Sequence, residues 1–182
     1  MSRNVNTVIL CEDRQQETFA RRFLIQTGLH PRCIRPIIAP KGRGAGEQFV
    51  RANFVQELLY FRRRSARMKQ ALVVVIDADT TSVEERIRQL DAAAQQAGCD
   101  PRRSDERVAI FVPARNIETW LAYLAGGDVN ESQTYPRLDR PRDCQSQVAS
   151  LHGYCQSQRL RDPAPPSLAA ACREYQLRLT SD

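Results

Sequence analysis

The sequence LVVVIDADT at residues 72–80 decides the fold of this chain. Its first five residues are apolar, three of them consecutive valines, and no polar residue interrupts them before Asp77. An unbroken β-branched run of this kind is typical of a strand that is covered on both faces at the centre of a parallel sheet. Open α/β sheets bind their ligands at the carboxyl ends of the strands, so Asp77 and Asp79 stand where a site is expected.

The two aspartates allow two interpretations. On a continuing strand, residues two apart point to the same face, so the carboxylates of Asp77 and Asp79 would repel each other unless a cation lay between them. Mg²⁺ is the cation that carboxylates bind in phosphate chemistry. Alternatively, both residues are turn formers that lead into a helix N-terminus. These nine residues by themselves favour neither interpretation.

Strands and helices alternate along the chain. Strands are predicted at residues 7–11, 33–39, 72–76 and 108–112, with amphipathic helices between them, and Pro36 makes the second strand an edge or bent strand. This alternation predicts an α/β fold with a mostly parallel four-stranded sheet, helices on both faces and residues 72–76 at the centre. We expect residues 1–125 to form the catalytic domain, and residues 126–182 to form a loop and a helical C-terminal extension packed on the same domain.

Length and composition limit the class of protein. A chain of 182 residues is expected to form one domain with a substantial core. It has no 18-residue apolar run, so no membrane span is predicted, and the N-terminal apolar stretch is too short for a signal peptide. We therefore expect a cytoplasmic protein whose six cysteines are thiols.

The positive charge suggests a nucleic-acid partner. The net charge is +6, and arginine supplies nearly all of the cations. Arginine binds phosphate bidentately, which suits DNA or RNA. Phosphate contacts are predicted in two segments. The first is the glycine-rich loop PKGRGAG at 40–46, with Lys41 and Arg43 as candidates. The second is a basic run at the end of the following helix, with Arg62, Arg63 and Arg64 as candidates. Alternatively, the loop is a flexible connection and the basic run a solvated helix end.

Acidic residues follow three of the predicted strands. Glu12 follows the first, Asp77 and Asp79 the third, and Glu118 lies on a short helix after the fourth. In a doubly wound sheet these strand ends share one rim, so we predict a shared metal site there. The competing interpretation of Glu12 is a solvated acid at a strand end.

Three segments also resemble the Toprim family: VILCED at 8–13, VVVIDADT at 73–80 and FVPARNIETWLAYL at 111–124. The family's signature is a glutamate after the first strand and an Asp-x-Asp after a later hydrophobic strand. RNIETWLAYL more narrowly resembles small bacterial Toprim-like proteins related to the nuclease domains of overcoming-lysogenization-defect enzymes, and PKGRGAG is similar to their Gly-Lys-Gly loop. There are two departures: Glu12 lacks a neighbouring glycine, and no third acid follows soon after Asp79, since Glu84 and Glu85 are expected to cap the next helix.

The resemblance implies a Toprim-like fold and a metal-dependent nuclease that cleaves phosphodiester bonds of DNA or RNA. It implies Mg²⁺ or Mn²⁺ bound by Glu12, Asp77 and Asp79, with Glu118 as a further catalytic acid. The same relatives suggest the nuclease subunit of a bacterial anti-phage defence system that acts with an ATPase partner. Whether the chain forms a homo-oligomer is left open.

Other functions remain as alternatives. The first is a catalytically silent module on the same fold that binds nucleic acid or a partner protein. A phosphoacceptor receiver domain would need a later strand ending in lysine, and no lysine follows Lys69. A zinc site could be formed by Cys144, His152, Cys155 and Cys172. These four residues lack the paired, closely spaced cysteines that are typical of zinc sites.

Overall fold

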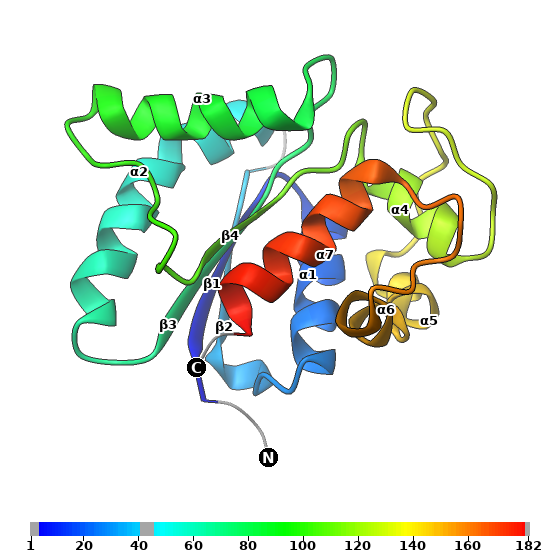
Figure 1. Ribbon diagram of the computed structural model, residues 1–182, viewed down its shortest axis with the longest axis horizontal. Helices are drawn as coiled ribbons and strands as arrows, with labels where there is room; N and C mark the ends of the chain where they lie inside the picture. Colours follow the sequence, from blue (N-terminus) through cyan, green and yellow to red (C-terminus); the bar gives the residue numbers. More distant parts are fainter. Residues whose placement is uncertain (1–3, 41–45, 181–182) are drawn as a thin grey trace.

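The computed structural model describes residues 4–40 and 46–180. Within these ranges the chain forms one four-stranded sheet in the order β2-β1-β3-β4, and every pair of neighbours is parallel. The strands are β1 (Asn6–Cys11), β2 (Ile34–Ile38), β3 (Gln70–Val75) and β4 (Val108–Phe111). The predicted α/β class and the parallel sheet are confirmed, and Figure 1 shows helices on both sides of it.

The apolar run at residues 72–76 lies at the centre of the sheet, as predicted. β3 pairs with β1 on one side and β4 on the other, and all six of its residues are buried. Val73 and Val75 face one core cluster, whereas Leu72 and Val74 face the other. A strand with apolar side chains on both faces can be buried only between two layers of helices, which explains the lack of polar alternation.

One face of the sheet carries the larger core. Phe23 of α1 packs edge-on against Phe111 of β4 and Tyr175 of α7, at ring-centroid distances of 6.2 and 5.0 Å. Trp120 is 1% exposed and donates a 2.8 Å hydrogen bond to Ser167. The helices that contribute to this core are α1 (Arg14–Gln26), α4 (Ile117–Leu124), α5 (Gln145–Val148), α6 (Leu151–Ser157) and α7 (Pro166–Leu179).

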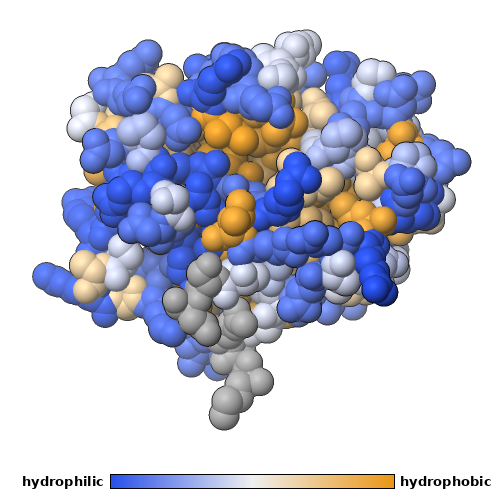
Figure 2. Space-filling view, in the orientation of Figure 1, coloured by the Kyte–Doolittle hydropathy of each residue, from blue (hydrophilic) through white to orange (hydrophobic). Residues whose placement is uncertain are grey.

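Two helices cover the opposite face. α2 (Gly46–Ser65) and α3 (Val83–Gln96) bury their apolar stripes against Leu72, Val74 and Ile76. On the side of the molecule seen in Figure 2, apolar side chains gather mainly between α3 and α7, and polar side chains surround them. Single 3₁₀ turns, Pro31–Cys33 and Pro141–Cys144, precede β2 and α5.

The C-terminal segment contributes to the main core. α7 packs against β4, and α6 packs against α7. Cys155 and Cys172 form a disulfide between these helices, so the prediction that all six cysteines are thiols is wrong at these two positions. Their Cα atoms lie 4.8 Å apart, within the range that a disulfide spans, because the two helices pack face to face. The bond also removes two of the four side chains that the zinc alternative requires.

The described residues contain no helix that is long and apolar enough to cross a membrane.

Candidate functional site

The carboxyl ends of β1 and β3 bring Glu12 and Asp77 into direct contact. Cys11 and Val75 are partners in the parallel register, so the residues that follow both strands emerge side by side. The Asp77 backbone N–H donates a 2.6 Å hydrogen bond to Oε1 of Glu12, across 65 positions of sequence. Glu12 and Asp77 are therefore neighbours at this rim, through the backbone N–H of Asp77.

Asp79 lies in a turn, so the two aspartates are not on a continuing strand. β3 ends at Val75, and Asp79 has a φ of +55°, in the left-handed region that aspartate tolerates in turns. Asp79 is exposed, whereas Asp77 is half-buried. The turn interpretation of this dipeptide is therefore correct for the backbone, although both carboxylates remain at the same rim.

The acids at this rim influence one another's protonation. Burial, with smaller contributions from the charges of Asp79 and Asp13, raises the pKa of Glu12 to about 7 against the lowering effect of the Asp77 N–H. Burial also raises the pKa of Asp77 well above its usual range, with contributions from the charges of Glu12, Asp79 and Glu118. The four acids predicted from the sequence thus belong to one electrostatic cluster.

Asp77 has an unsatisfied oxygen. Its Oδ1 is buried and accepts no hydrogen bond. Within the described ranges no ion pair reaches Glu12, Asp77 or Asp79. Leaving a buried acceptor unpaired costs about 1–3 kcal/mol, and more when it is charged, so this oxygen is an unfavourable feature of the described structure unless a partner is supplied from outside it.

Glu118 lies beside the cluster in the first turn of α4, and its side chain is 2% exposed. Nε of Arg137, in the loop between α4 and α5, donates a 3.1 Å hydrogen bond to Oε1 of Glu118. The same guanidinium pairs with Asp13, which caps α1 by accepting a 2.9 Å hydrogen bond from the Gln16 N–H. Arg137 therefore neutralises the part of the rim next to Glu12.

Arg86 fixes the turn that carries the aspartates. This α3 side chain is buried and donates to the carbonyl oxygens of Asp77 (3.0 Å) and Ala78 (3.1 Å). It also pairs with Glu47 in the first turn of α2. The sequence analysis missed Arg86. A signal was available, because it stands four residues before Leu90 and eight before Ala94, on the buried stripe of α3.

The glycine-rich loop begins and ends beside Glu12. The Ala39 N–H donates to the Cys11 carbonyl at 3.2 Å, and a Cβ added to Gly46 would lie 2.7 Å from the Cβ of Glu12. The predicted phosphate contacts Lys41 and Arg43 lie outside the described residues. The described residues on either side of this segment, Ala39 and Gly46, both lie beside the end of β1.

The basic run does not act as one patch. Arg62 donates to both carboxylate oxygens of Glu106 (2.6 and 3.0 Å) and to two backbone carbonyls, so its guanidinium is committed within the protein. Arg63 stacks over the Tyr60 ring, 4.6 Å from its centroid. Arg64 is exposed. This run also lies near the start of β3, at the opposite end of the sheet from the acids.

The described part of the chain contains no preformed metal cage. No three His, Cys, Asp or Glu side chains within it are arranged around a common point that could hold an ion. Binding of a cation at the cluster would therefore require Asp77, Glu12 and Asp79 to turn their carboxylates toward each other.

Comparison of the chain with protein-family models, with curated proteins and with solved structures found no match. The similarity to Toprim proteins rests on the short motifs at residues 8–13, 73–80 and 111–124.

Proposed function

We propose that this chain is a metal-dependent nuclease that cleaves phosphodiester bonds in DNA or RNA. Glu12, Asp77 and Asp79 would bind Mg²⁺ or Mn²⁺, with Glu118 as a further acid of the site. The observation that carries the proposal is the buried Oδ1 of Asp77, which has no hydrogen-bond partner and belongs to a residue whose backbone N–H donates to the Glu12 carboxylate. An all-oxygen donor set is the one that Mg²⁺ and Mn²⁺ prefer.

The bound ion would neutralise the phosphate and lower the pKa of a water molecule. The chain itself supplies position. Arg86 holds the backbone of the turn that presents Asp77, and the Asp77 N–H orients the Glu12 carboxylate. Arg137 pairs with Glu118 and Asp13 and so compensates their negative charge beside the three proposed ligands.

Several features support a phosphodiester substrate. The chain has a net charge of +6. The described residues that flank Lys41 and Arg43 in sequence, Ala39 and Gly46, lie beside Cys11 and Glu12. The strand order and the positions of the acids are consistent with a Toprim-like fold. By the same resemblance we propose a cytoplasmic nuclease subunit of an anti-phage defence system that acts with an ATPase partner.

Metal-dependent cleavage tests this function. Plasmid, linear DNA and single-stranded RNA are incubated with Mg²⁺, Mn²⁺ or EDTA, with and without a candidate ATPase partner. We expect Asp77→Asn to lower the rate by about a hundredfold or more, because a ligand of the catalytic ion is lost. Asp128→Asn is the matched control, since this aspartate is 90% exposed and pairs with Arg161 away from the cluster. Full activity of Asp77→Asn would contradict the proposal.

Metal binding can be measured without a partner or a substrate. Mn²⁺ titration followed by electron paramagnetic resonance, and the Mg²⁺ dependence of the melting temperature, should both show a site that Asp77→Asn removes and Asp128→Asn retains. Absence of any saturable ion binding by the wild-type chain at about 10 mM Mg²⁺ would oppose a resident metal site.

A catalytically silent binding module on the same fold is the second candidate. Two observations favour it: no preformed metal cage exists in the described residues, and Glu12 already accepts a hydrogen bond from Asp77. The two functions differ in their effects on binding and on cleavage. A silent module binds nucleic acid equally well in EDTA and in Mg²⁺, and it cleaves nothing when the partner is present.

A further inference from the structure

A cavity of about 390 Å³ lies between α2 and the sheet, away from the acidic rim. Its floor is formed by Val8 of β1 and by Ala71 and Leu72 of β3. Val8 precedes Glu12 by four residues, so the cavity is about 13 Å from the acids along the strand. Its volume is in the range of pockets that enclose small organic ligands.

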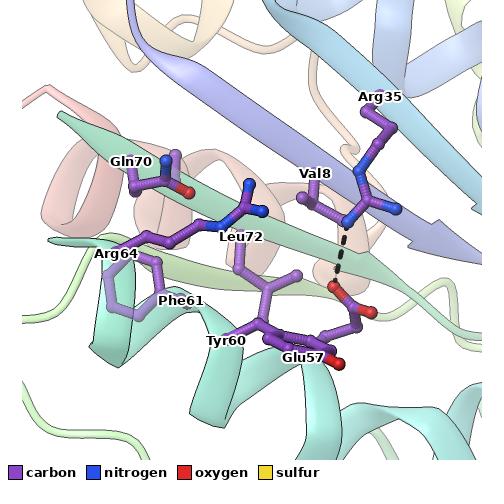
Figure 3. Close-up of a pocket in the computed structure, with 9 residues that line it drawn as sticks. Val8, Arg35, Glu57, Tyr60, Phe61, Arg64, Gln70 and Leu72 are labelled. Carbon is purple, nitrogen blue, oxygen red and sulfur yellow. Dashed lines mark hydrogen bonds and ion pairs between the residues drawn. The ribbon is translucent and has the colours of Figure 1, made fainter. Parts of the chain in front are cut away.

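The walls combine two aromatic rings with two cations. Tyr60 and Phe61 of α2 line one side of the cavity. Arg64 comes from α2 and Arg35 from β2, so the positive charge converges from two elements. Figure 3 shows the Arg64 guanidinium between Gln70 and the Arg35–Glu57 ion pair.

The charges of the lining leave an excess of one cation. Arg35 pairs with Glu57 at 3.3 Å, whereas within the described chain no ion pair involves Arg64. Arg64 is exposed at the mouth of the cavity, so its guanidinium is available to an anion. A guanidinium binds phosphate or carboxylate through two parallel hydrogen bonds.

Gln70 adds a buried donor. This residue is 5% exposed and lines the cavity, and its Nε2 has no hydrogen-bond partner. Buried amide groups in folded proteins almost always have a partner, so the Gln70 amide can gain one from a ligand in the cavity if its side chain rotates toward it.

We propose that this cavity binds a nucleotide. The ring would lie on the apolar floor against Tyr60 and Phe61, an acceptor on the edge of the ring would receive the Gln70 amide, and the phosphate would bind Arg64 and Arg35. A simple anion would leave the apolar floor and Gln70 unused, and an apolar ligand would leave Arg64 without an ion-pair partner. The ligand is either a free mononucleotide or the terminal nucleotide of a strand. The inference does not depend on the proposed nuclease activity.

The test is isothermal titration calorimetry on the full chain in EDTA, where a metal site contributes nothing. The four ribonucleoside 5′-monophosphates are compared with adenosine, ribose 5-phosphate and inorganic phosphate. A six-nucleotide strand with or without a 5′-phosphate distinguishes the two sources of the ligand. Competition between the phosphorylated strand and a mononucleotide shows whether they occupy the same site.

We expect at least one mononucleotide or the 5′-phosphorylated strand to bind saturably. The affinity of this ligand should exceed those of adenosine and ribose 5-phosphate by about tenfold or more, because adenosine lacks the phosphate and ribose 5-phosphate lacks the base. Arg64→Ala should weaken binding by about tenfold or more. Arg67→Ala, an exposed neighbour that does not line the cavity, should bind as the wild type does.

Gln70→Leu provides a second variant. It removes the unpaired amide, so it should fold at least as stably as the wild type while losing preference among the bases. Three results would overturn the proposal: no saturable binding of any nucleotide or strand at about 5 mM, inorganic phosphate binding as tightly as a mononucleotide, or equal losses for Arg64→Ala and Arg67→Ala.

Discussion

Glu12 carries an electrostatic cost that depends on pH. Its pKa is about 7 in the folded chain against an ordinary 4.5, so the folded state retains a proton that the unfolded state has lost between these values. The free energy of unfolding therefore falls as the pH rises from about 4.5 to 7. Above pH 7 the Glu12 carboxyl is ionised in both states and its destabilising effect no longer grows. A shift of this size corresponds to roughly 3 kcal/mol.

The first prediction follows from this cost. Glu12→Gln keeps an oxygen that can accept from the Asp77 N–H but removes the charge, and it also relieves Asp77. We expect the free energy of unfolding in EDTA to rise by about 1–3 kcal/mol at pH 8 and to be unchanged at pH 4. Urea denaturation followed by Trp120 fluorescence measures it. Glu84→Gln, an exposed position in α3, is the control, and a loss of stability at pH 8 in Glu12→Gln would contradict the argument.

The second prediction concerns Arg137. Burial raises the pKa of Glu118 and the charge of Arg137 lowers it, so removing the guanidinium leaves a buried carboxylate uncompensated above its pKa. Arg137 is 70% exposed, so solvent screens the pair. We expect Arg137→Ala to lower the free energy of unfolding by about 1 kcal/mol at pH 8 and by less at pH 4.

Arg140→Ala is the matched control for that experiment, because Arg140 is 63% exposed and pairs locally with Asp143. Equal losses for the two variants, or a loss at pH 4 as large as at pH 8, would show that the Glu118 pair is not the cause.

The acids could be found from the sequence because parallel strands place their carboxyl ends on one rim. Asp77 and Glu12 meet for this reason. Arg137 could not be found, because the segment between α4 and α5 has no periodicity that would indicate which side chain turns inward. The sequence left the backbone of Asp79 open between a continuing strand and a turn, and the structure shows the turn, since β3 ends earlier and the chain turns at a positive φ.

Among the secondary-structure elements, α2 connects the acidic rim to the cavity. Its first residue, Gly46, contacts Glu12, and its last turns carry Arg64 at the cavity wall. The helix has 20 residues and is therefore about 30 Å long. The sequence predicted the helix and its basic end, but it could not show that Arg62 turns toward Glu106 while Arg64 remains exposed.

The third prediction uses the contact at the start of α2. A Cβ at Gly46 would approach the Glu12 Cβ to 2.7 Å, so either the helix or the strand end must move. We expect Gly46→Ala to destabilise the chain by about 1–3 kcal/mol and to weaken any metal binding at Glu12. Gly153→Ala is the control within another helix, where an added Cβ meets nothing within 4 Å.

Replacing a glycine inside a helix by alanine should leave stability unchanged or raise it by about 0.5–1 kcal/mol. Equal effects at the two glycines in thermal denaturation would show that the close approach at Gly46 is relieved without cost.

At the scale of the whole molecule, the C-terminal segment completes the core. α7 adds five buried side chains to the core cluster that contains Phe23, Phe111 and Trp120. The five are Leu168, Ala171, Cys172, Tyr175 and Leu179. Removing the segment would expose these aromatic residues to water, with a loss of burial that a domain of marginal stability does not tolerate.

The fourth prediction is that residues 1–125 do not fold by themselves. We expect the truncated chain to aggregate, or to bind a hydrophobic dye without showing a cooperative urea transition, whereas the full chain unfolds in one transition. Circular dichroism and Trp120 fluorescence measured on both chains provide the comparison. A cooperative transition of the fragment with the midpoint of the full chain would show that α7 is dispensable.

The overall architecture was the part most open to prediction, because a fully apolar β-branched run can be satisfied only in the middle of a covered sheet. The disulfide between Cys155 and Cys172 could not be predicted from the sequence. The pairing of cysteines depends on which helices face each other, and spacing along the chain does not determine that.

The parallel pairing of β1 with β3 also orders events during protein synthesis. Glu12 and the backbone donor that orients it are separated by 65 positions, so β1 leaves the ribosome well before its central neighbour exists. β2 can pair with β1 earlier, but both core clusters require side chains of β3. Contacts this distant close late, because the entropy of the intervening chain must be lost first. A nascent chain therefore brings Glu12 and Asp77 together only in the same step that closes its core, so the acidic rim and the folded core arise together.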